Sequence, residues 1–399
     1  MQELKQKYEK LFKEELMDYC APFWLKYGQD KENGGVLNCI DKNGEVYSTD
    51  KAVWMQGRTA WTYSKLCNQF GYKKEWADFA KSCLNFEKEH CIDKTDGRMY
   101  FTVTIDGKPL RKRRYWFSET FYIIANAEYY KVSKEEKYLV EARKYYDFVY
   151  GIYAKTIKDP FNITPKSYSK TRNLKPLAQP MILLNVSRIL LDIDKDNYDK
   201  YNANIIKLIS DIKVFYKKEL KAMLECVCAD DNSVILDVSE TRIVNPGHDL
   251  ECCWFLLEEA VRLNDNELIA FVEEVYENAL KTGWDDEYGG ILYFKDVLGK
   301  PVEAYEHDMK LWWPHNEAII ASLALYEKTG KEVYKTNFEK ICEYAFSHFS
   351  DRPTGEWLGY LRRDGKPTEP PVKGHTYKGA FHVMRMLIKC LEIFEKGDC

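Results

Sequence analysis

The 399-residue chain lacks the features that mark membrane, secreted or disordered proteins. No window approaches 18 consecutive apolar residues, and the charged segment Met1–Lys7 has none of the apolar core of a secretory signal. No Pro/Ser-rich or low-complexity stretch interrupts the sequence, and 45% of its residues are hydrophobic, which is enough for a large core. We therefore expect a folded cytoplasmic protein without a membrane span.

The chain also lacks excess charge and metal-binding cysteine spacing. Its 59 basic and 63 acidic residues are mixed along the sequence, so there is no basic stripe that could neutralise a nucleic-acid backbone. The single basic run, Arg111–Arg114, is interpreted as a solvated loop. Twelve cysteines include Cys226, Cys228 and the neighbours Cys252 and Cys253, but no C-x-x-C pair typical of a zinc ribbon or a thioredoxin. We expect reduced thiols, no metal, and neither nucleic acid nor a membrane as partner.

What the chain does contain is a repeated unit. Short apolar segments closed by Gly turns, the signature of β-hairpins, occur at 33–44, 96–108, 288–301 and 354–367. Apolar residues at i, i+3, i+4 and i+7 predict helices at 54–70, 118–130, 248–263, 313–326 and 377–394. Further amphipathic helices are predicted between them, at 76–90, 135–150, 267–283 and 332–349.

The unit of helix, hairpin loop and helix recurs about every 60 to 70 residues, so six units account for the chain. We predict one all-α domain over residues 1–399, an (α/α)6 barrel with short β-hairpins in the loops on one face. An open helical solenoid is less favoured because terminal capping repeats are not evident. In the closed barrel, residues at the starts of the inner helices converge on a central pocket.

Polar residues lie at these predicted helix starts in most of the repeats. They are Arg58, Glu119, Asn185, His248, Glu251, Glu317, His382 and Arg385. Two of them are histidines with a charged residue one helical turn later, Glu251 after His248 and Arg385 after His382. Two imidazoles with different charged neighbours are suited to removing a proton from one face of a carbon and returning it to the other.

Six segments resemble the N-acylglucosamine 2-epimerase family, which includes the renin-binding proteins. They are V-W-M-Q-G-R at 53–58, F-S-E at 117–119, L-A-Q-P-M-I-L-L-N at 177–185, G-H-D-L-E-C-C-W at 247–254, W-P-H-N-E-A at 313–318 and K-G-x-F-H at 378–382. The resemblance implies an (α/α)6 barrel that interconverts N-acetylglucosamine and N-acetylmannosamine without a metal or redox cofactor. It also implies a cytoplasmic homodimer of amino sugar and sialic acid metabolism, with ATP as an effector rather than a substrate.

The resemblance assigns catalytic roles to His248, His382, Arg58, Glu317 and Arg385. We expect Glu251, Asn185, Glu119 and Trp313 to contact the substrate. One position departs from the family, because His315 stands where the family commonly has Gln. We give His315 no catalytic role.

A proton-transfer mechanism follows from the chemistry of an amino sugar. The hydrogen at C2 is acidic only when C1 is a carbonyl, so the sugar ring must open first. A histidine can then remove this proton, and Arg58 is our choice to stabilise the enolate. We expect Arg385 to keep His382 neutral as the base and Glu251 to keep His248 charged as the acid.

Other functions remain open at this point. A cellobiose 2-epimerase or a mannose-type aldose–ketose isomerase would use the same two histidines on another sugar. A glycoside hydrolase would use paired carboxylates such as Glu119 and Glu317, but it would leave the histidines without a role. The tract Glu306–Asp308 with His315 lacks convincing metal-ligand spacing and is interpreted as a solvated loop.

A non-enzymatic interaction protein of the renin-binding type is the remaining alternative. Its support is a heptad spacing of three leucines, Leu177, Leu184 and Leu191. A coiled coil needs more heptads than this, so we interpret the leucines as packing between the two helix rings.

Overall fold

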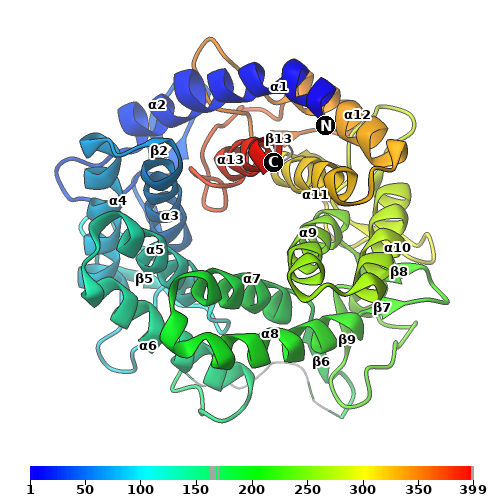
Figure 1. Cartoon of the computed structure of the whole chain (residues 1–399). Coiled ribbons are helices and arrows are strands. Elements are labelled where there is room, and N and C mark those ends of the chain that lie inside the picture. Colours follow the sequence, from blue (N-terminus) through cyan, green and yellow to red (C-terminus); the bar gives the residue numbers. More distant parts are fainter. Residues whose placement is uncertain (162–167, 169, 397–399) are drawn as a thin grey trace.

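The computed structural model describes residues 1–161, 168 and 170–396, and it forms two concentric rings of helices (Figure 1). The inner ring consists of α3 (Val53–Phe70), α5 (Phe117–Ser133), α7 (Ala178–Ile193), α9 (Pro246–Leu263), α11 (Trp312–Thr329) and α13 (His382–Lys396). The outer ring contains α4 (Lys74–Phe86), α6 (Glu136–Tyr153), α8 (Tyr198–Lys213), α10 (Asn266–Gly283) and α12 (Glu332–His348). The predicted (α/α)6 barrel is confirmed.

The chain begins in the outer ring with an irregular helical segment. It comprises α1 (Gln2–Glu14), the π-helical η1 (Glu15–Cys20), α2 (Ala21–Phe23) and the π-helical η2 (Trp24–Gly28). Three further short turns of helix connect other elements: η3 (Glu87–Cys91), η4 (Lys195–Asn197) and η5 (Ser239–Thr241). This first segment lies against α13, so the beginning and the end of the described chain close the rings together.

The two rings differ in the pattern of their apolar residues. On α5 of the inner ring every residue from Ser118 to Tyr129 is buried, because this helix packs against neighbours on all sides. On α8 of the outer ring the buried residues lie on one face, as expected for an amphipathic helix. Burying one large aliphatic side chain stabilises the fold by about 1.5–3 kcal/mol, so this layer between the rings dominates the stability.

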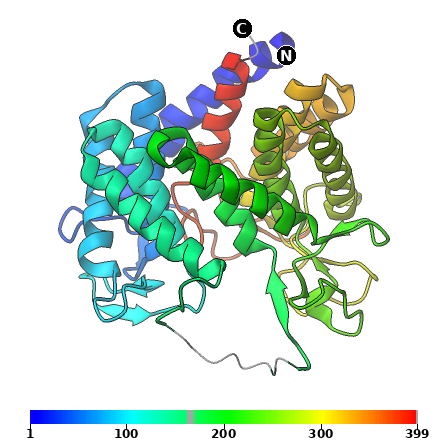
Figure 2. The same ribbon diagram turned by 60° about the horizontal axis from the view of Figure 1, so that its bottom comes forward.

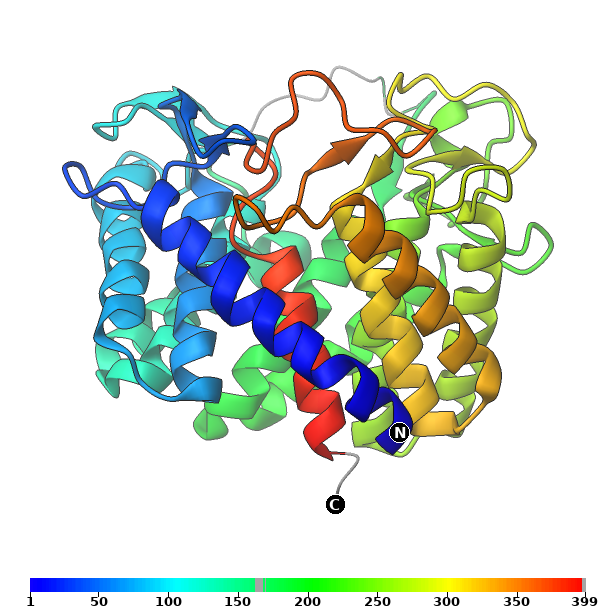
Figure 3. The same ribbon diagram turned by 90° about the horizontal axis from the view of Figure 1, so that it is seen from above.

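The strands are short, antiparallel, and gathered at one end of the barrel (Figures 2 and 3). They pair as β1 (Cys39–Ile40) with β2 (Val46–Ser48), β3 (Lys51–Ala52) with β4 (Thr102–Val103) and β5 (Pro109–Arg111), and β6 (Leu174–Pro176) with β9 (Cys226–Cys228). The others pair as β7 (Tyr216–Lys217) with β8 (Ala222–Met223), β10 (Ile243–Val244) with β11 (Lys295–Asp296), and β12 (Lys310–Leu311) with β13 (Tyr360–Leu361). The N-terminus lies at the opposite end of the barrel (Figure 3).

The loop predictions are right in two repeats, partly right in a third and wrong in the fourth. The turns at Gly44 and Gly107 join local hairpins, β1 to β2 and β4 to β5. The segment at 354–367 contains a short local hairpin, with an antiparallel bridge from Leu361 to Pro367 across the Gly365 turn, but β13 itself pairs with β12. In the segment at 288–301, β11 pairs with β10 and not within the segment. Both partners are strands that lead directly into an inner helix, so these loops connect neighbouring repeats.

A buried lysine fixes the acidic turn in several of these loops. Lys51 Nζ lies 2.7 Å from Asp30 Oδ2, and Lys310 Nζ lies 2.8 Å from Asp285 Oδ2, with both lysines fully buried. Each lysine lies on the strand just before an inner helix. Removing one partner of such a pair leaves a buried charge and costs about 3–5 kcal/mol. The pairs therefore hold the loops in place above the starts of the inner helices.

Side chains of the inner helices also hold the loops, through hydrogen bonds to the loop backbone. In three repeats the backbone N–H after the Gly turn donates to an inner-helix side chain: Gln56 Oε1 at 2.8 Å, Glu119 Oε1 at 2.9 Å and His315 Nε2 at 2.9 Å. These three residues are fully buried and occupy equivalent positions in their repeats. They are structural acceptors for the loop backbone.

Within the described residues, no helix is long and apolar enough to span a membrane.

Candidate active site

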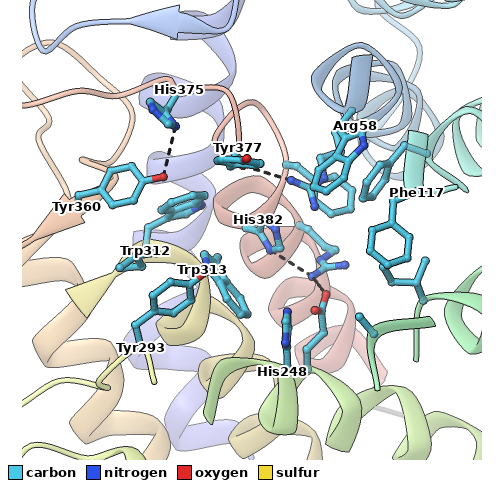
Figure 4. Close-up of a pocket in the computed structure, with 18 of the residues that line it drawn as sticks. Arg58, Phe117, His248, Tyr293, Trp312, Trp313, Tyr360, His375, Tyr377 and His382 are labelled. Carbon is cyan, nitrogen blue, oxygen red and sulfur yellow. Dashed lines mark hydrogen bonds and ion pairs between the residues drawn. The ribbon is translucent and has the colours of Figure 1, made fainter. Parts of the chain in front are cut away.

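A cavity of about 1000 Å³ opens between the inner-helix starts, on the side where the strands lie. Seven of the predicted site residues line it: Arg58, Asn185, His248, Glu251, Trp313, His382 and Arg385. Figure 4 shows His248 and His382 near one another, with aromatic side chains around them. The convergence expected from the repeats therefore occurs for most of the predicted residues.

Helix α9 begins in a way that fixes His248 at the cavity. Asn245 caps the helix, since its side-chain oxygen accepts from the backbone N–H groups of Gly247 at 3.0 Å and His248 at 3.2 Å. Pro246 follows as the first helical residue, where a missing N–H does no harm. A Cβ at Gly247 would lie only 2.7 Å from the Trp313 ring, so glycine is required for the close approach of α9 and α11.

His248 pairs with a carboxylate that sequence reasoning missed. Its Nδ1 lies 2.9 and 3.0 Å from the two carboxylate oxygens of Glu225, so Nδ1 carries a proton and donates it. Burial alone would lower the pKa of His248, but Glu225 outweighs burial, with help from Glu251 and Glu317, and raises it. His248 is therefore suited to hold a second proton on Nε2, the nitrogen that remains for a ligand.

Glu225 lies in the loop between β8 and β9, where the sequence carries no catalytic motif. Its backbone N–H donates to the Ile243 carbonyl at 2.9 Å, and its carbonyl accepts from the Leu177 N–H at 2.9 Å. These bonds tie it to the segments that lead into α9 and α7. Its position is thus set by two other repeats, which explains why local pattern could not identify it.

His382 is the first residue of α13 and has its own carboxylate partner. Its Nδ1 lies 2.8 Å from Glu317 Oε1 and 3.3 Å from Arg385 Nη2. The shorter contact is to an acceptor, so Nδ1 carries the proton and donates it to Glu317. Nε2 is then left unprotonated, as required of a base. Glu317 is itself fully buried, and its other oxygen accepts from Trp254 Nε1 at 2.8 Å.

The pKa of His382 is shifted in the opposite direction from that of His248. Burial is the main cause that lowers it well below its ordinary value, followed by the positive charges of Arg58 and Arg385. Glu251 opposes this shift. At neutral pH His382 is therefore a neutral imidazole. The direction matches the sequence prediction, but burial and Arg58 contribute more than Arg385, and Lys378 contributes as well.

Arg385 lies between two carboxylates rather than acting on His382 alone. Its Nη2 lies 2.5 Å from Glu251 Oε1 and 2.7 Å from Glu317 Oε1. Burial opposes the charge, but Glu317 and Glu251 outweigh it and raise the pKa of Arg385. Glu251 is thus the ion-pair partner of Arg385. It also helps to raise the pKa of His248, as predicted, but the carboxylate paired with His248 is Glu225.

The donors of Glu251, Glu317 and His382 lie within 4.8 Å of one another, a spacing that could suit a metal ion. The Arg385 guanidinium already lies among these donors, within 3.3 Å of each. A divalent cation would have to displace a buried positive charge that these donors hold. The expectation that the site works without a metal stays a prediction.

Arg58 is a partly exposed cation on the cavity wall, with no carboxylate within ion-pair distance among the described residues. Its guanidinium carbon lies 4.2 Å from the centre of the Phe121 ring and 5.0 Å from that of Phe381. Its Nη1 donates to the Tyr377 carbonyl at 3.3 Å, as Figure 4 shows. Burial, with Arg385 nearby, lowers its pKa to about 9, so it stays charged at neutral pH. Such a cation is placed to stabilise a negative oxygen in the cavity.

Trp313 contacts both histidines. The centre of its ring lies 5.1 Å from that of His248 and 5.9 Å from that of His382. Tyr293, Trp312 and Tyr360 continue this aromatic wall on the same side of His382 (Figure 4). Flat aromatic faces of this kind suit the C–H bonds of a sugar, and the polar edges of Tyr and Trp suit its hydroxyls.

Two predicted residues do not line the cavity. Glu119 is fully buried behind it, where its carboxylate lies 2.5 Å from Arg98 Nε and accepts from the Met99 N–H. It fixes a loop, as Gln56 does in the first repeat, and the prediction that it contacts the substrate is corrected accordingly. Glu317 also lies behind the wall, but it holds His382 and Arg385 in place and so belongs to the site as a positioning residue.

His315, like Glu119, fixes a loop and does not contact the cavity. Its Nε2 accepts from the Ile291 N–H, and its Nδ1 donates to the Leu311 carbonyl at 2.7 Å, so both nitrogens are engaged. Burial lowers its pKa to about 3, against the effect of the Leu311 carbonyl. The neutral imidazole therefore accepts a hydrogen bond from the loop backbone, as the amide of the equivalent Gln56 does.

We expect Glu225→Gln to change the pH dependence of activity. If His248 is the acid, activity falls as pH rises through its raised pKa and falls as pH drops through the lowered pKa of His382. Glu225→Gln removes the charge that raises the His248 pKa, so the alkaline limb should move to lower pH while the acid limb stays in place. The measurement is kcat/KM against pH.

The matched control is Glu240→Gln, which removes an exposed carboxylate that pairs with Arg172. It should leave both limbs unchanged. An alkaline limb that does not move in Glu225→Gln would show that His248 does not titrate in the working range through this carboxylate.

Comparisons with known proteins find similarity to sugar 2-epimerases. The profile of the N-acylglucosamine 2-epimerase (GlcNAc 2-epimerase) family matches residues 35–385. The N-acylglucosamine 2-epimerase of Rattus norvegicus is 35% identical over 381 residues, which covers 94% of this chain and 90% of that protein. A cellobiose 2-epimerase of Dictyoglomus turgidum is 24% identical over 409 residues, covering 96% of this chain and 97% of that protein.

A solved structure shares the whole architecture. The structure of cellobiose 2-epimerase from Spirochaeta thermophila superposes with a TM-score of 0.84 at 19% identity, covering 98% of this chain and 97% of that one. At this identity the likeness bears on the fold alone.

Proposed function

The chain belongs to the N-acylglucosamine 2-epimerase family, and on that basis we propose that it is an isomerase that interconverts N-acetylglucosamine and N-acetylmannosamine by epimerisation at C2. The observation that carries the mechanism is the pair of imidazoles on the cavity. Each has its Nδ1 on a carboxylate, and their pKa values are shifted in opposite directions.

The reaction begins with the open-chain sugar, because only a C1 carbonyl makes the C2–H bond acidic. His382 Nε2 takes the C2 proton, and the electron pair of the C–H bond forms the C1–C2 double bond of an enolate. The negative charge passes to the oxygen on C1, where Arg58 stabilises it. His248 Nε2 then delivers a proton to the opposite face of C2 and restores the C1 carbonyl.

For the other epimer the two histidines exchange roles. His248 must then be neutral and His382 protonated, so both directions require one proton shared over the pair.

The two carboxylates that a glycoside hydrolase would need, Glu119 and Glu317, are engaged by other side chains. Glu317 accepts hydrogen bonds from Trp254, His382 and Arg385, and Glu119 is held by Arg98 behind the cavity wall. Neither carboxylate is in a position to reach a glycosidic oxygen. Glycoside hydrolysis needs one carboxylic acid and one carboxylate on either side of the bond.

The choice of sugar rests on the relatives. Identity is 35% to an N-acylglucosamine 2-epimerase and 24% to a cellobiose 2-epimerase, each over nearly the whole chain. A mannose-type isomerase would move the hydrogen between C1 and C2 and yield a ketose. An acylamino group at C2 blocks this outcome, because the oxygen needed for the ketone is absent.

Incubating the protein with sugars in deuterated water tests the function. N-acetylglucosamine and N-acetylmannosamine should each gain deuterium at C2 and convert to the other, as followed by NMR. Wash-in with cellobiose or mannose but not with N-acetylhexosamines would indicate one of the two related enzymes. Bond cleavage would indicate a hydrolase, and no change with any sugar would indicate a binding protein.

Several properties implied by the sequence resemblance complete the proposal. We propose a cytoplasmic homodimer of amino sugar and sialic acid metabolism that needs no cofactor and responds to ATP as an effector. The location is supported by eleven described cysteines that are all free thiols. The dimer and the ATP response are supported by the resemblance alone.

A further inference from the structure

We propose that the N-acyl group of the substrate binds in a subsite formed by Asn185 and Ile124, which lie further along their inner helices than the two histidines do along theirs. Asn185 donates to the acyl carbonyl, and Ile124 limits the length of the acyl chain. This inference rests on the proposed function and identifies the residues that select an N-acyl sugar.

The planarity of the enolate sets the direction of the acyl group. When C2 becomes trigonal, its substituents lie in one plane, and the two proton-transferring imidazoles must approach from the two faces of that plane. The acylamino group therefore leaves C2 sideways, past the imidazoles. Trp313 contacts both of them and closes one side. The other side leads to Phe121 and Phe381, which enclose Arg58, and then to α5 and α7.

The wall on that side is apolar apart from the Asn185 amide and the Thr120 hydroxyl, which already donates to the Phe117 carbonyl. From α5 and α7 it presents Ile124, Ile182 and Val186, with Asn185 among them. The Asn185 side chain makes no hydrogen bond to another described residue, in contrast to Asn126 on α5, which donates to a backbone carbonyl at 2.8 Å. The Asn185 amide is partly exposed and has no protein partner among the described residues, so it is free to donate to the carbonyl of an acyl group. The apolar wall around it suits the alkyl part of that group.

A second small cavity limits the depth of this subsite. It has a volume of about 100 Å³ and lies below the first, and the two share Ile124, Asn185, Phe381 and Arg385 as lining residues. These four side chains thus form the floor of the main cavity. Ile124 is the aliphatic member of the floor, so shortening it should join the two spaces.

The first test compares N-acetyl, N-propanoyl and N-butanoyl glucosamine. An extra methylene that does not fit a hydrophobic pocket costs about 10- to 200-fold in kcat/KM. The wild-type protein should therefore prefer N-acetyl over N-butanoyl by at least about tenfold. In Ile124→Ala this preference should fall by about tenfold or more, as measured by kcat/KM for each sugar.

Ile123→Ala is the matched control, because Ile123 is the buried neighbour on α5 and lines neither cavity. It should keep the wild-type preference even if it lowers stability. The inference is overturned if the wild type shows no preference, if Ile124→Ala keeps it, or if Ile123→Ala loses it equally.

The second test uses Asn185→Leu, which keeps the size of the side chain and removes its amide. Loss of a neutral hydrogen bond to the acyl carbonyl should lower kcat/KM for N-acetylglucosamine by about 3- to 10-fold, mainly through KM, since the bond is present before and during the reaction. Asn266→Leu, at an exposed position on α10, should change neither constant. An unchanged KM in Asn185→Leu contradicts the subsite.

These outcomes are separate from failure of the proposed function. If the wild-type protein exchanges the C2 hydrogen of none of the N-acyl sugars, the function is wrong. If it epimerises them while both variants behave as wild type, the function stands and the subsite is wrong.

Discussion

Replacing either His248 or His382 with asparagine is expected to lower kcat for C2 epimerisation by about 10²- to 10⁴-fold, the usual contribution of a general acid or base. The loss should appear in both directions, because each inversion uses one imidazole to remove a proton and the other to return it. Asparagine keeps a polar group near the position of Nδ1, so the contacts to Glu225 and Glu317 are partly retained. The measurement is the initial rate from each pure epimer.

The matched control is His307→Asn, in the loop that the sequence analysis considered as a metal site. His307 does not line the cavity. Its contacts within the loop are backbone hydrogen bonds to Phe294 and Ala304, which the substitution retains. This variant should keep the wild-type rate. Near wild-type turnover in either His248→Asn or His382→Asn, with the fold intact by circular dichroism, would remove the two-base mechanism.

Arg58→Leu should lower kcat by about 10²- to 10³-fold, as expected when a donor to a developing negative oxygen is lost. The effect should fall on kcat more than on KM, because the charge on the C1 oxygen develops only as the proton leaves C2. Leucine retains apolar contacts with Phe121 and Phe381, so the wall of the cavity should survive. The kinetic constants are measured from each epimer.

Arg172→Leu provides the control, since Arg172 pairs with Glu240 on the surface. A variant Arg58→Leu that raises KM and leaves kcat unchanged would show that Arg58 only binds the ground-state sugar. The enolate would then need another stabilising group.

The inner helices and the two histidines were predictable because both depend on local pattern. Helix α9 was predicted two residues short of its observed start, since Pro246 and Gly247 precede the apolar periodicity that marks the helix. Helix α13 was predicted to begin at Tyr377 but begins at His382. The intervening residues include Lys378, whose buried ammonium is held by Glu356 at 3.0 Å, a contact 22 residues away in sequence.

Long-range pairings account for the errors in the site. The sequence indicated that Glu251 keeps His248 charged, because the two are one turn apart on a helix, but it did not reveal Glu225, which has the larger effect. In the fold Glu251 faces Arg385 from a different repeat, and Glu225 approaches His248 from a loop. Glu119 was misassigned for the opposite reason: its position at a helix start is shared with catalytic residues, but its side chain points to the loop behind the wall.

The most direct test of the two-base mechanism follows the C2 proton in deuterated water. Each single-histidine variant, His248→Asn and His382→Asn, is incubated with each pure epimer, and deuterium at C2 is followed by NMR. The remaining histidine can abstract and redeliver a proton on its own face, so each variant should exchange the C2 hydrogen of one epimer without inversion and leave the other unlabelled. The two variants should show opposite preferences. If both variants exchange both epimers equally, neither histidine is confined to one face, and the assignment of His382 and His248 to opposite faces of C2 is wrong.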